Sequence, residues 1–267
     1  MHIFLTIWFS LLILSLLFVG FDAITRAPVS WVQKLAWILV TLYTGIVGAI
    51  LYWIACRKPA HGDHEQFTRA TWKQGLNSEM HCVAGDATGI IIAAVVLTLF
   101  HFTNGVDIII EYIIAFISGL FIFQALMMLS MYGNYWLAVR KTFFAETVSM
   151  NCVMIGMIPV TVFLAVALTG GDDPLSLGFW LRMDMATIVG TITAFPINYW
   201  LVKKNLKHGC MTLPKKGAKM PSTMTHSMPM HKMNSLPMLQ QLAWMAFTFI
   251  LLLFVLYITS HFIPIRL

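Results

Sequence analysis

Long apolar stretches alternate with short polar connections along most of this chain. Seven of these stretches have about 20 residues, the length that an α-helix needs to cross the hydrocarbon core of a bilayer. None alternates polar and apolar residues as a barrel strand does, so we predict an all-α, polytopic transmembrane helical bundle of about seven helices. The stretches are residues 3–21, 35–55, 80–102, 108–131, 147–169, 178–202 and 242–263.

These stretches divide the chain into three parts. We expect a membrane bundle of six helices over residues 1–202, a basic loop rich in Met and His over residues 203–241, and a seventh transmembrane helix over residues 242–267. The first apolar stretch has no preceding basic segment and no small-residue cleavage site after it, so we expect a retained helix rather than a signal peptide.

Composition and charge agree with a membrane protein. Of 267 residues, 59% are hydrophobic and 10% are charged, and the mean hydropathy is +0.80, whereas soluble domains are about a quarter charged. Lysine and arginine concentrate in the connections after the second, fourth and sixth stretches, which predicts that these connections and the N-terminus are cytoplasmic, with the protein in the inner membrane. The net charge of +6 therefore reflects topology and contact with anionic lipid, not nucleic-acid binding.

The third stretch opens with small and polar residues. Cys82, Asp86 and Gly89 share one face of a helix, and Gly85 with Gly89 forms a G-x-x-x-G pair that lets a neighbouring helix approach closely. A carboxylate inside a membrane needs a partner. Asp86 is therefore either a structural hydrogen-bonding group or part of a polar site.

Antiparallel threading brings further polar residues to the membrane face where this third stretch begins. The start of the fifth stretch and the end of the sixth reach the same face, whichever side is cytoplasmic. We predict an intramembrane polar site there, with His81 and Cys82 as metal ligands. Its other members are Asp86, Glu146, Ser149 and Asn198.

The long connection carries a second candidate site. Thioether and imidazole groups are ligands that suit Cu(I), and packing does not require so many methionines in a linker rich in Pro and Lys. We therefore expect copper binding, and the alternative is a biased linker composition. The candidate ligands are Met224, His226, Met228, Met230, His231 and Met233.

Two smaller polar groups have simpler explanations. His61 and His64 have a His-x-x-His spacing that could hold a metal ion, although such a pair in a polar loop is more often just solvated. At the opposite membrane face, Arg182 can be neutralised by Asp184 or Glu111.

Several blocks of residues carry a family resemblance. The most specific are His81-Cys82 and Phe195–Leu201, and others are Phe21-Asp22, Glu111-Tyr112 and Ala145–Ser149. On these blocks, which span most of residues 15–207, the chain resembles the multi-spanning bacterial and archaeal membrane proteins called domain of unknown function 4396. The resemblance implies a multi-helix membrane fold and an association with copper-related proteins. Many members have a second Cys where Asp86 stands.

These observations favour an integral membrane protein that handles copper, by transporting the ion or by delivering it to a partner such as a copper enzyme. The loop would capture the ion and the intramembrane site would hold it. The alternative is an accessory structural subunit of a larger membrane-bound respiratory or copper-enzyme complex. An enzyme is less favoured, because no nucleophile–base pair can be recognised locally in the sequence.

Overall fold

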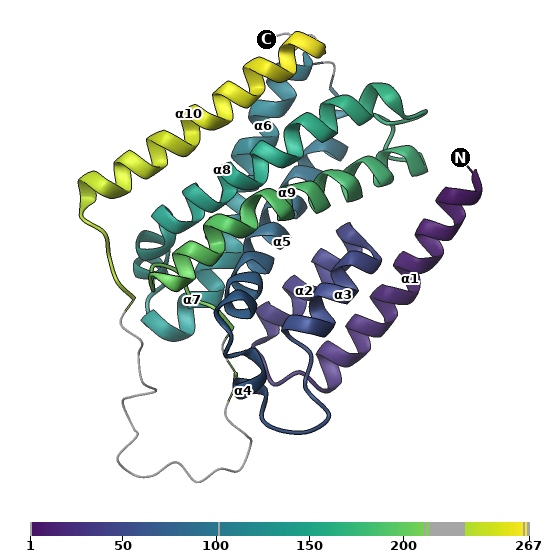
Figure 1. The fold of residues 1–267 in the computed structure, drawn as a ribbon. Coiled ribbons are helices and arrows are strands. Elements are labelled where there is room, and N and C mark those ends of the chain that lie inside the picture. Colours follow the sequence, from purple (N-terminus) through teal and green to yellow (C-terminus); the bar gives the residue numbers. More distant parts are fainter. Residues whose placement is uncertain (1, 101, 211, 214–232, 264, 266–267) are drawn as a thin grey trace, which may run out of the picture.

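The computed structural model describes residues 2–100, 102–210, 212–213, 233–263 and 265, and there the chain is helical apart from its connections (Figure 1). Six helices in these residues are long and apolar enough to cross a membrane. This confirms the predicted all-α membrane bundle. The six are α1 (His2–Thr25), α5 (Thr71–Leu97), a continuous rod of α6 (Asn104–Ile117), η1 (Ser118–Gln124) and α7 (Ala125–Tyr132), then α8 (Tyr135–Ala167), α9 (Leu177–Lys203) and α10 (Met238–Phe262).

The second apolar stretch is not a single span. It forms α2 (Trp31–Thr44) and α3 (Ile46–Ala55), which meet at Gly45. Gly45 has a φ of +56°, a conformation that glycine adopts without steric cost and that ends the first helix. At 1.5 Å per residue, helices of 14 and 10 residues are about 21 and 15 Å long, so neither crosses a core of about 30 Å.

Contacts across the break show that α2 and α3 fold back on one another. The rings of Trp37 and Tyr52 lie 5.6 Å apart, edge to face. Asn77 of α5 joins both helices, because its Oδ1 accepts from Trp37 Nε1 at 3.1 Å and its Nδ2 donates to the Ala55 carbonyl at 2.9 Å. The seventh span expected from hydropathy is thus a hairpin whose two open ends lie together.

Because α2 and α3 do not cross the membrane, α1 begins at the other end of the bundle from where seven spans would place it. Trp8 Nε1 donates to Asp184 Oδ2 at 2.7 Å, which places the start of α1 beside the start of α9. Tyr52 donates to Asp22 Oδ2 at 2.8 Å, which places the end of α1 beside the end of α3. The first turns of α1 therefore lie at the opposite end of the bundle from the end of α9 (Figure 1), although the sequence analysis placed the N-terminus and the long connection on one side.

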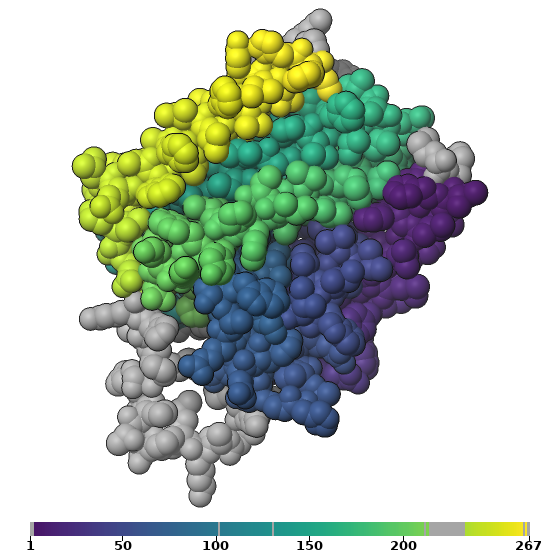
Figure 2. All heavy atoms as spheres, viewed as in Figure 1, coloured from purple at the N-terminus to yellow at the C-terminus, as the bar shows by residue number. Residues whose placement is uncertain are grey.

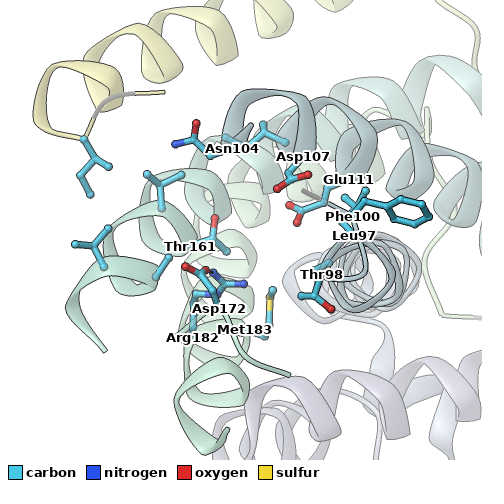
Figure 3. Close-up of a pocket in the computed structure, with 16 residues that line it drawn as sticks. Leu97, Thr98, Phe100, Asn104, Asp107, Glu111, Thr161, Asp172, Arg182 and Met183 are labelled. Atoms are coloured by element: carbon cyan, nitrogen blue, oxygen red, sulfur yellow. Dashed lines mark hydrogen bonds and ion pairs between the residues drawn. The ribbon is translucent and has the colours of Figure 1, made fainter. Parts of the chain in front are cut away.

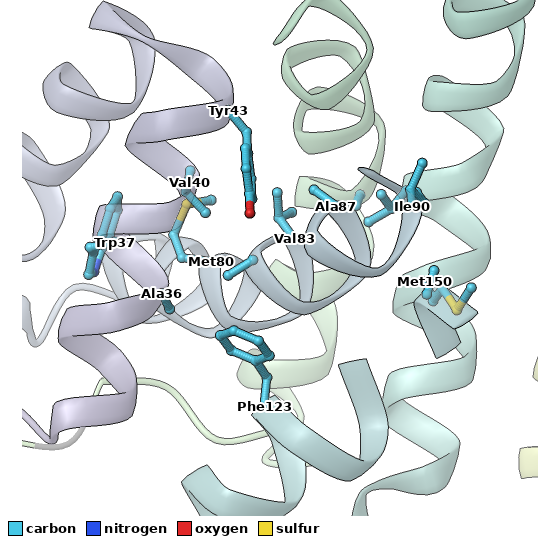
Figure 4. Close-up of a cluster of buried hydrophobic side chains, with 14 of the residues drawn as sticks. Ala36, Trp37, Val40, Tyr43, Met80, Val83, Ala87, Ile90, Phe123 and Met150 are labelled. Carbon is cyan, nitrogen blue, oxygen red and sulfur yellow. The ribbon is translucent and has the colours of Figure 1, made fainter. Parts of the chain in front are cut away.

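The core of the bundle is built around α5. In the most apolar part of α5, 78% of the residues are buried, compared with 11% in α10. Helix α10 lies along α8 on the outer surface (Figure 2). Side chains of α2, α5 and η1 interlock in the main hydrophobic cluster (Figure 4). Members that these helices supply include Trp37, Val40, Met80, Val83 and Phe123.

The predicted G-x-x-x-G face of α5 is a site of close helix packing. A Cβ added to Gly85 would lie 2.7 Å from the Gly119 Cα, and one added to Gly89 would lie 2.6 Å from the Ala115 Cα. The opposing backbone belongs to α6 and to η1, a π-helical turn of the kind often found at functional sites. The close helix approach predicted from the spacing is confirmed.

Candidate functional site

A cluster of polar side chains lies inside the bundle where α5 begins and α9 ends, which we call the Lys207 end. All of these residues are between 0% and 3% exposed. They come from three helices and from the segment that follows α9. The members are Glu79, His81, Cys82 and Asp86 of α5, Glu146 and Ser149 of α8, Asn198 of α9, and Lys207.

Lys207 supplies a cation at the centre of this cluster. Its Nζ lies 2.5 Å from Asn198 Oδ1, 2.8 Å from Cys82 Sγ and 3.3 Å from Ser149 Oγ. A lysine at the membrane face normally extends to solvent, but this one is 3% exposed. Its ammonium is therefore enclosed by a sulfur and two oxygens.

The local sequence explains how Lys207 reaches the interior. After α9, Asn205 has a φ of +55°, and the Leu206 N–H donates to the Leu201 carbonyl at 2.9 Å. These are the features of a Schellman cap, in which a left-handed residue turns the chain back across the last helical turn. Leu206 packs with Leu201 and Val148 in a small hydrophobic cluster, which directs the next residue into the bundle.

The thiol and carboxyl groups of the cluster form a connected chain with the ammonium. Cys82 Sγ donates to Glu146 Oε2 at 2.7 Å. On the other side of the ammonium, Ser149 and Asn198 exchange hydrogen bonds at 3.1 and 2.9 Å. Removal of the thiol proton would therefore place a thiolate beside Lys207 with a carboxylate ready to accept the proton.

Several buried atoms of the cluster have no hydrogen-bond partner among the described residues. They are both oxygens of Glu79, both ring nitrogens of His81, both oxygens of Asp86, and Glu146 Oε1. A Cβ added to Gly119 would contact both Asp86 Oδ1 and Glu146 Oε1, so the two carboxyls face one point. Buried polar atoms are costly when unpaired, and such an arrangement is suited to receive a proton or a cation.

The charges in the cluster are unequal in number. Burial alone would lower the pKa of Lys207, but Cys82, Glu146 and Glu79 raise it above its ordinary value. Lys207 is therefore an ammonium ion at neutral pH. One ammonium stands against three carboxyl groups, those of Glu79, Asp86 and Glu146.

Six of these residues are predicted from the sequence, and two are not. The structure brings Cys82, Glu146, Ser149 and Asn198 into one network, with Asp86 facing Glu146 and His81 beside Cys82 on the helix. Lys207 was counted only among the basic residues of the connection after the sixth apolar stretch, and Glu79 was not considered. The available signal was charge balance, because buried acids in a membrane require a cation.

The candidate ligands in the long connection cannot be compared with the structure in the same way. Met224, His226, Met228, Met230 and His231 lie outside the described residues. Met233 is described: its Sδ accepts a hydrogen bond from Tyr132 Oη at 3.3 Å and it packs against the main hydrophobic cluster.

The opposite end of the bundle holds a separate cavity of about 430 Å³ (Figure 3). Asp107, Glu111, Asp172 and Arg182 are among its lining residues. Arg182 forms an ion pair with Asp172, and its charge also acts on Glu111 in the same cavity, as one of the two predicted alternatives had it. Asp184 instead accepts from Trp8.

Comparisons with known proteins give one match. A family model described as "Domain of unknown function (DUF4396)" matches residues 71–207. This region begins with α5 and ends at Lys207, so it contains the whole buried cluster. No curated protein and no solved structure matches the chain.

Proposed function

The chain belongs to the DUF4396 family, whose description states no activity, and we propose from the buried cluster that it is an integral membrane protein that transports or delivers copper ions. The observation that carries this proposal is the enclosed ammonium of Lys207. Its Nζ is held by the Cys82 sulfur and by oxygens of Ser149 and Asn198. These atoms form a cation site inside the membrane bundle that the protein's own lysine fills.

The unpaired carboxyls give the site capacity for more positive charge. In a low-dielectric interior each buried charge needs a partner. Lys207 can balance one carboxylate, which leaves the others to hold protons or a second cation. A monovalent or divalent ion that enters can therefore replace protons without leaving unbalanced charge.

Cys82 makes copper the favoured ion. A thiolate is a soft ligand that selects Cu(I) over hard ions such as Mg²⁺ or Ca²⁺. When Cys82 binds the ion as a thiolate, Glu146 Oε2, 2.7 Å from the sulfur, is positioned to accept the thiol proton. His81, whose two ring nitrogens have no hydrogen-bond partner in the described part of the chain, is the second candidate ligand on α5.

The Met- and His-containing segment adds support from the sequence. It joins the Lys207 end of the bundle to α10, so an ion captured there would be delivered close to Cys82. In this proposal Met224, His226, Met228, Met230, His231 and Met233 receive the ion and the buried cluster passes it on, across the membrane or to a copper enzyme.

We further propose that the Lys207 end faces the cytoplasm of the inner membrane. Among the described lysines and arginines, Arg182 alone lies at the opposite end, and the positive-inside rule then orients the bundle. The N-terminus would face the other side. The residues at the Lys207 end are Arg26, Lys34, Arg57, Lys58, Arg69, Lys73, Arg140, Lys141, Lys203, Lys204 and Lys207.

The test is copper uptake by liposomes that contain the purified full-length chain and an enclosed Cu(I) chelator. Wild-type protein should accelerate uptake, and Cys82→Ser should reduce the initial rate by about tenfold or more, because a hydroxyl is a poor Cu(I) ligand. Cys152→Ser is the matched control, since Cys152 lies on α8 outside the hydrogen-bonded network.

Two results would contradict the proposal. One is equal uptake by wild-type and Cys82→Ser protein, which would remove the buried cluster from the copper path. The other is a wild-type chain that neither moves nor binds copper, which would favour an accessory subunit of a larger membrane complex.

A further inference from the structure

A second group of metal-ligating side chains lies at the Lys207 end, apart from the buried cluster. Cys56 follows α3, His64 begins the short helix α4 (His64–Thr68), and Cys210 lies in the segment after α9. One ligand atom from each residue lies within 4.8 Å of the other two. Cys56 and His64 are buried and Cys210 is partly buried.

The hydrogen bonds of His64 leave one ring nitrogen ready to bind an ion. Nε2 lies 2.8 Å from the Cys56 carbonyl oxygen, which can only accept, so in the neutral ring Nε2 carries the proton. Nδ1 therefore presents its lone pair, and at present it accepts from the Thr212 hydroxyl at 2.8 Å. A histidine ligand that donates its other N–H to a backbone carbonyl is a common arrangement in metal sites.

The protonation states are those expected of this group without an ion. Burial lowers the pKa of His64, so the imidazole is neutral at pH 7. Burial, and then the neighbouring Cys210, raises the pKa of Cys56, so Cys56 is a thiol. A divalent ion would displace the thiol protons, as metal binding to cysteine normally does.

We propose that Cys56, His64 and Cys210 form a Zn(II) site that fastens the segment after α9 to the connection between α3 and α4. The ion would bind two thiolate sulfurs and His64 Nδ1, and the two thiol protons would pass to solvent. Two thiolates neutralise Zn(II), whereas they would leave a net negative charge around Cu(I). The fourth position of a tetrahedral ion is left for water or for the Thr212 hydroxyl.

The geometry requires little movement. Tetrahedral bonds of about 2.3 Å hold the ligand atoms about 3.8 Å apart, so two sulfurs and a histidine ring nitrogen that lie within 4.8 Å of one another need to close by about 1 Å or less. Other contacts already hold the segment in place. Thr212 is paired with Val29 in an isolated β-bridge, and the Leu213 N–H donates to the Pro28 carbonyl at 2.7 Å.

The position of this site gives it a consequence for the buried cluster. Cys210 follows Lys207 by three residues, and α4 lies at the same end of the bundle as this segment (Figure 1). An ion bound by Cys210 would limit how far Lys207 can withdraw from Cys82. The zinc site itself does not depend on which ion the buried cluster handles.

Cobalt substitution tests the site on the purified full-length chain. Co(II) with thiolate ligands gives a near-ultraviolet charge-transfer band that thioethers and imidazoles do not give. We expect wild-type protein to show this band with one Co(II) bound, and one equivalent of Zn(II) to remove it. Cys56→Ser and Cys210→Ser should each reduce the band at least by half, while Cys82→Ser and Cys152→Ser should keep it.

The proposal would be overturned if wild-type protein did not show the band. It would also be overturned if the site of Cys56, His64 and Cys210 bound Cu(I) but not Zn(II). A band that depends on Cys82 or Cys152 would overturn it as well. Copper uptake is a separate measurement: loss of uptake in Cys82→Ser with an intact cobalt band leaves the zinc site standing.

A second measurement needs no variant and so does not depend on the folding of a mutant. N-ethylmaleimide modification of wild-type protein, followed by mass spectrometry of each cysteine peptide, should slow at Cys56 and Cys210 at least tenfold when Zn(II) is added. The rate at Cys152 should stay unchanged. Equal rates with and without Zn(II) at Cys210 would contradict the site.

Discussion

Replacing Lys207 by methionine tests whether its ammonium holds the buried cluster together. Lys207→Met keeps a long unbranched side chain and removes the charge that lies between Cys82 and Asn198. Three hydrogen bonds are lost, and the buried carboxyl groups of Glu146 and Glu79 lose the cation that interacts with them electrostatically. Removing one partner from a buried charged group typically costs about 3–5 kcal/mol, because the remaining charge is left unpaired.

The expected loss is therefore large on the scale of a stability assay. For a chain of this size, 1 kcal/mol corresponds to roughly 2–4 °C in the midpoint of thermal unfolding, so Lys207→Met should lower the midpoint by on the order of 10 °C. The pKa of Lys207 is raised in the folded protein. Its contribution is thus fully present below the ordinary lysine pKa of about 10.4 and is lost only as the pH rises through the raised value, so pH 7–8 is suitable.

The assay is thermal unfolding of the detergent-purified chain, followed by tryptophan fluorescence at a fixed heating rate. Lys204→Met is the matched control, because Lys204 is exposed in the same segment and its loss should change stability by about 0.5 kcal/mol or less. Adding Glu146→Gln to Lys207→Met should restore part of the midpoint, since the pair then lacks both charges. Equal midpoints for Lys207→Met and Lys204→Met would refute the central role of the ammonium.

Two further predictions concern helix packing and topology. Gly89→Ala should destabilise the bundle by about 1–3 kcal/mol, because its Cβ would meet the Ala115 backbone. Gly20→Ala is the control: a Cβ there has no neighbour within 4 Å, so this change should be neutral or slightly stabilising. Equal unfolding midpoints for the two variants would contradict the close packing at Gly89. In a background without native cysteines, Ile3→Cys and Ala60→Cys should react with an impermeant thiol reagent from opposite sides of the membrane; reaction from the same side would mean that residues 35–55 cross the bilayer after all.

Hydropathy was sufficient for the helices that cross the membrane and insufficient for the hairpin. The stretch 35–55 is as apolar as a true span, and the feature that divides it is the left-handed conformation of Gly45. That conformation depends on contacts that form only in the folded bundle, among them the Trp37–Tyr52 pair and the bonds of Asn77 to both helices. A sequence pattern alone cannot distinguish such a turn from a glycine that packs inside a helix.

The polar cluster was predictable to the extent that it lies on helices. Cys82, Glu146 and Asn198 were brought together by antiparallel threading, because helix ends at one face must meet. Lys207 was missed because a lysine in a polar connection is ordinarily solvated, and its burial results from the cap at Asn205 and the packing of Leu206. These are tertiary features of a segment that has no periodic pattern.

The location of this cation on a connection rather than on a helix has a physical consequence. A lysine in the middle of a transmembrane helix costs about 2.5–3.5 kcal/mol on insertion and then stays in the interior with its helix. Lys207, on the segment after α9, can enter once the helices have assembled around Glu146 and Cys82. In the proposed function, exchange of Lys207 for another cation would require movement of that segment and not of a membrane-spanning helix. The proposed copper function requires such an exchange, so the stability and the copper binding of Lys207 variants should be measured on the same preparation.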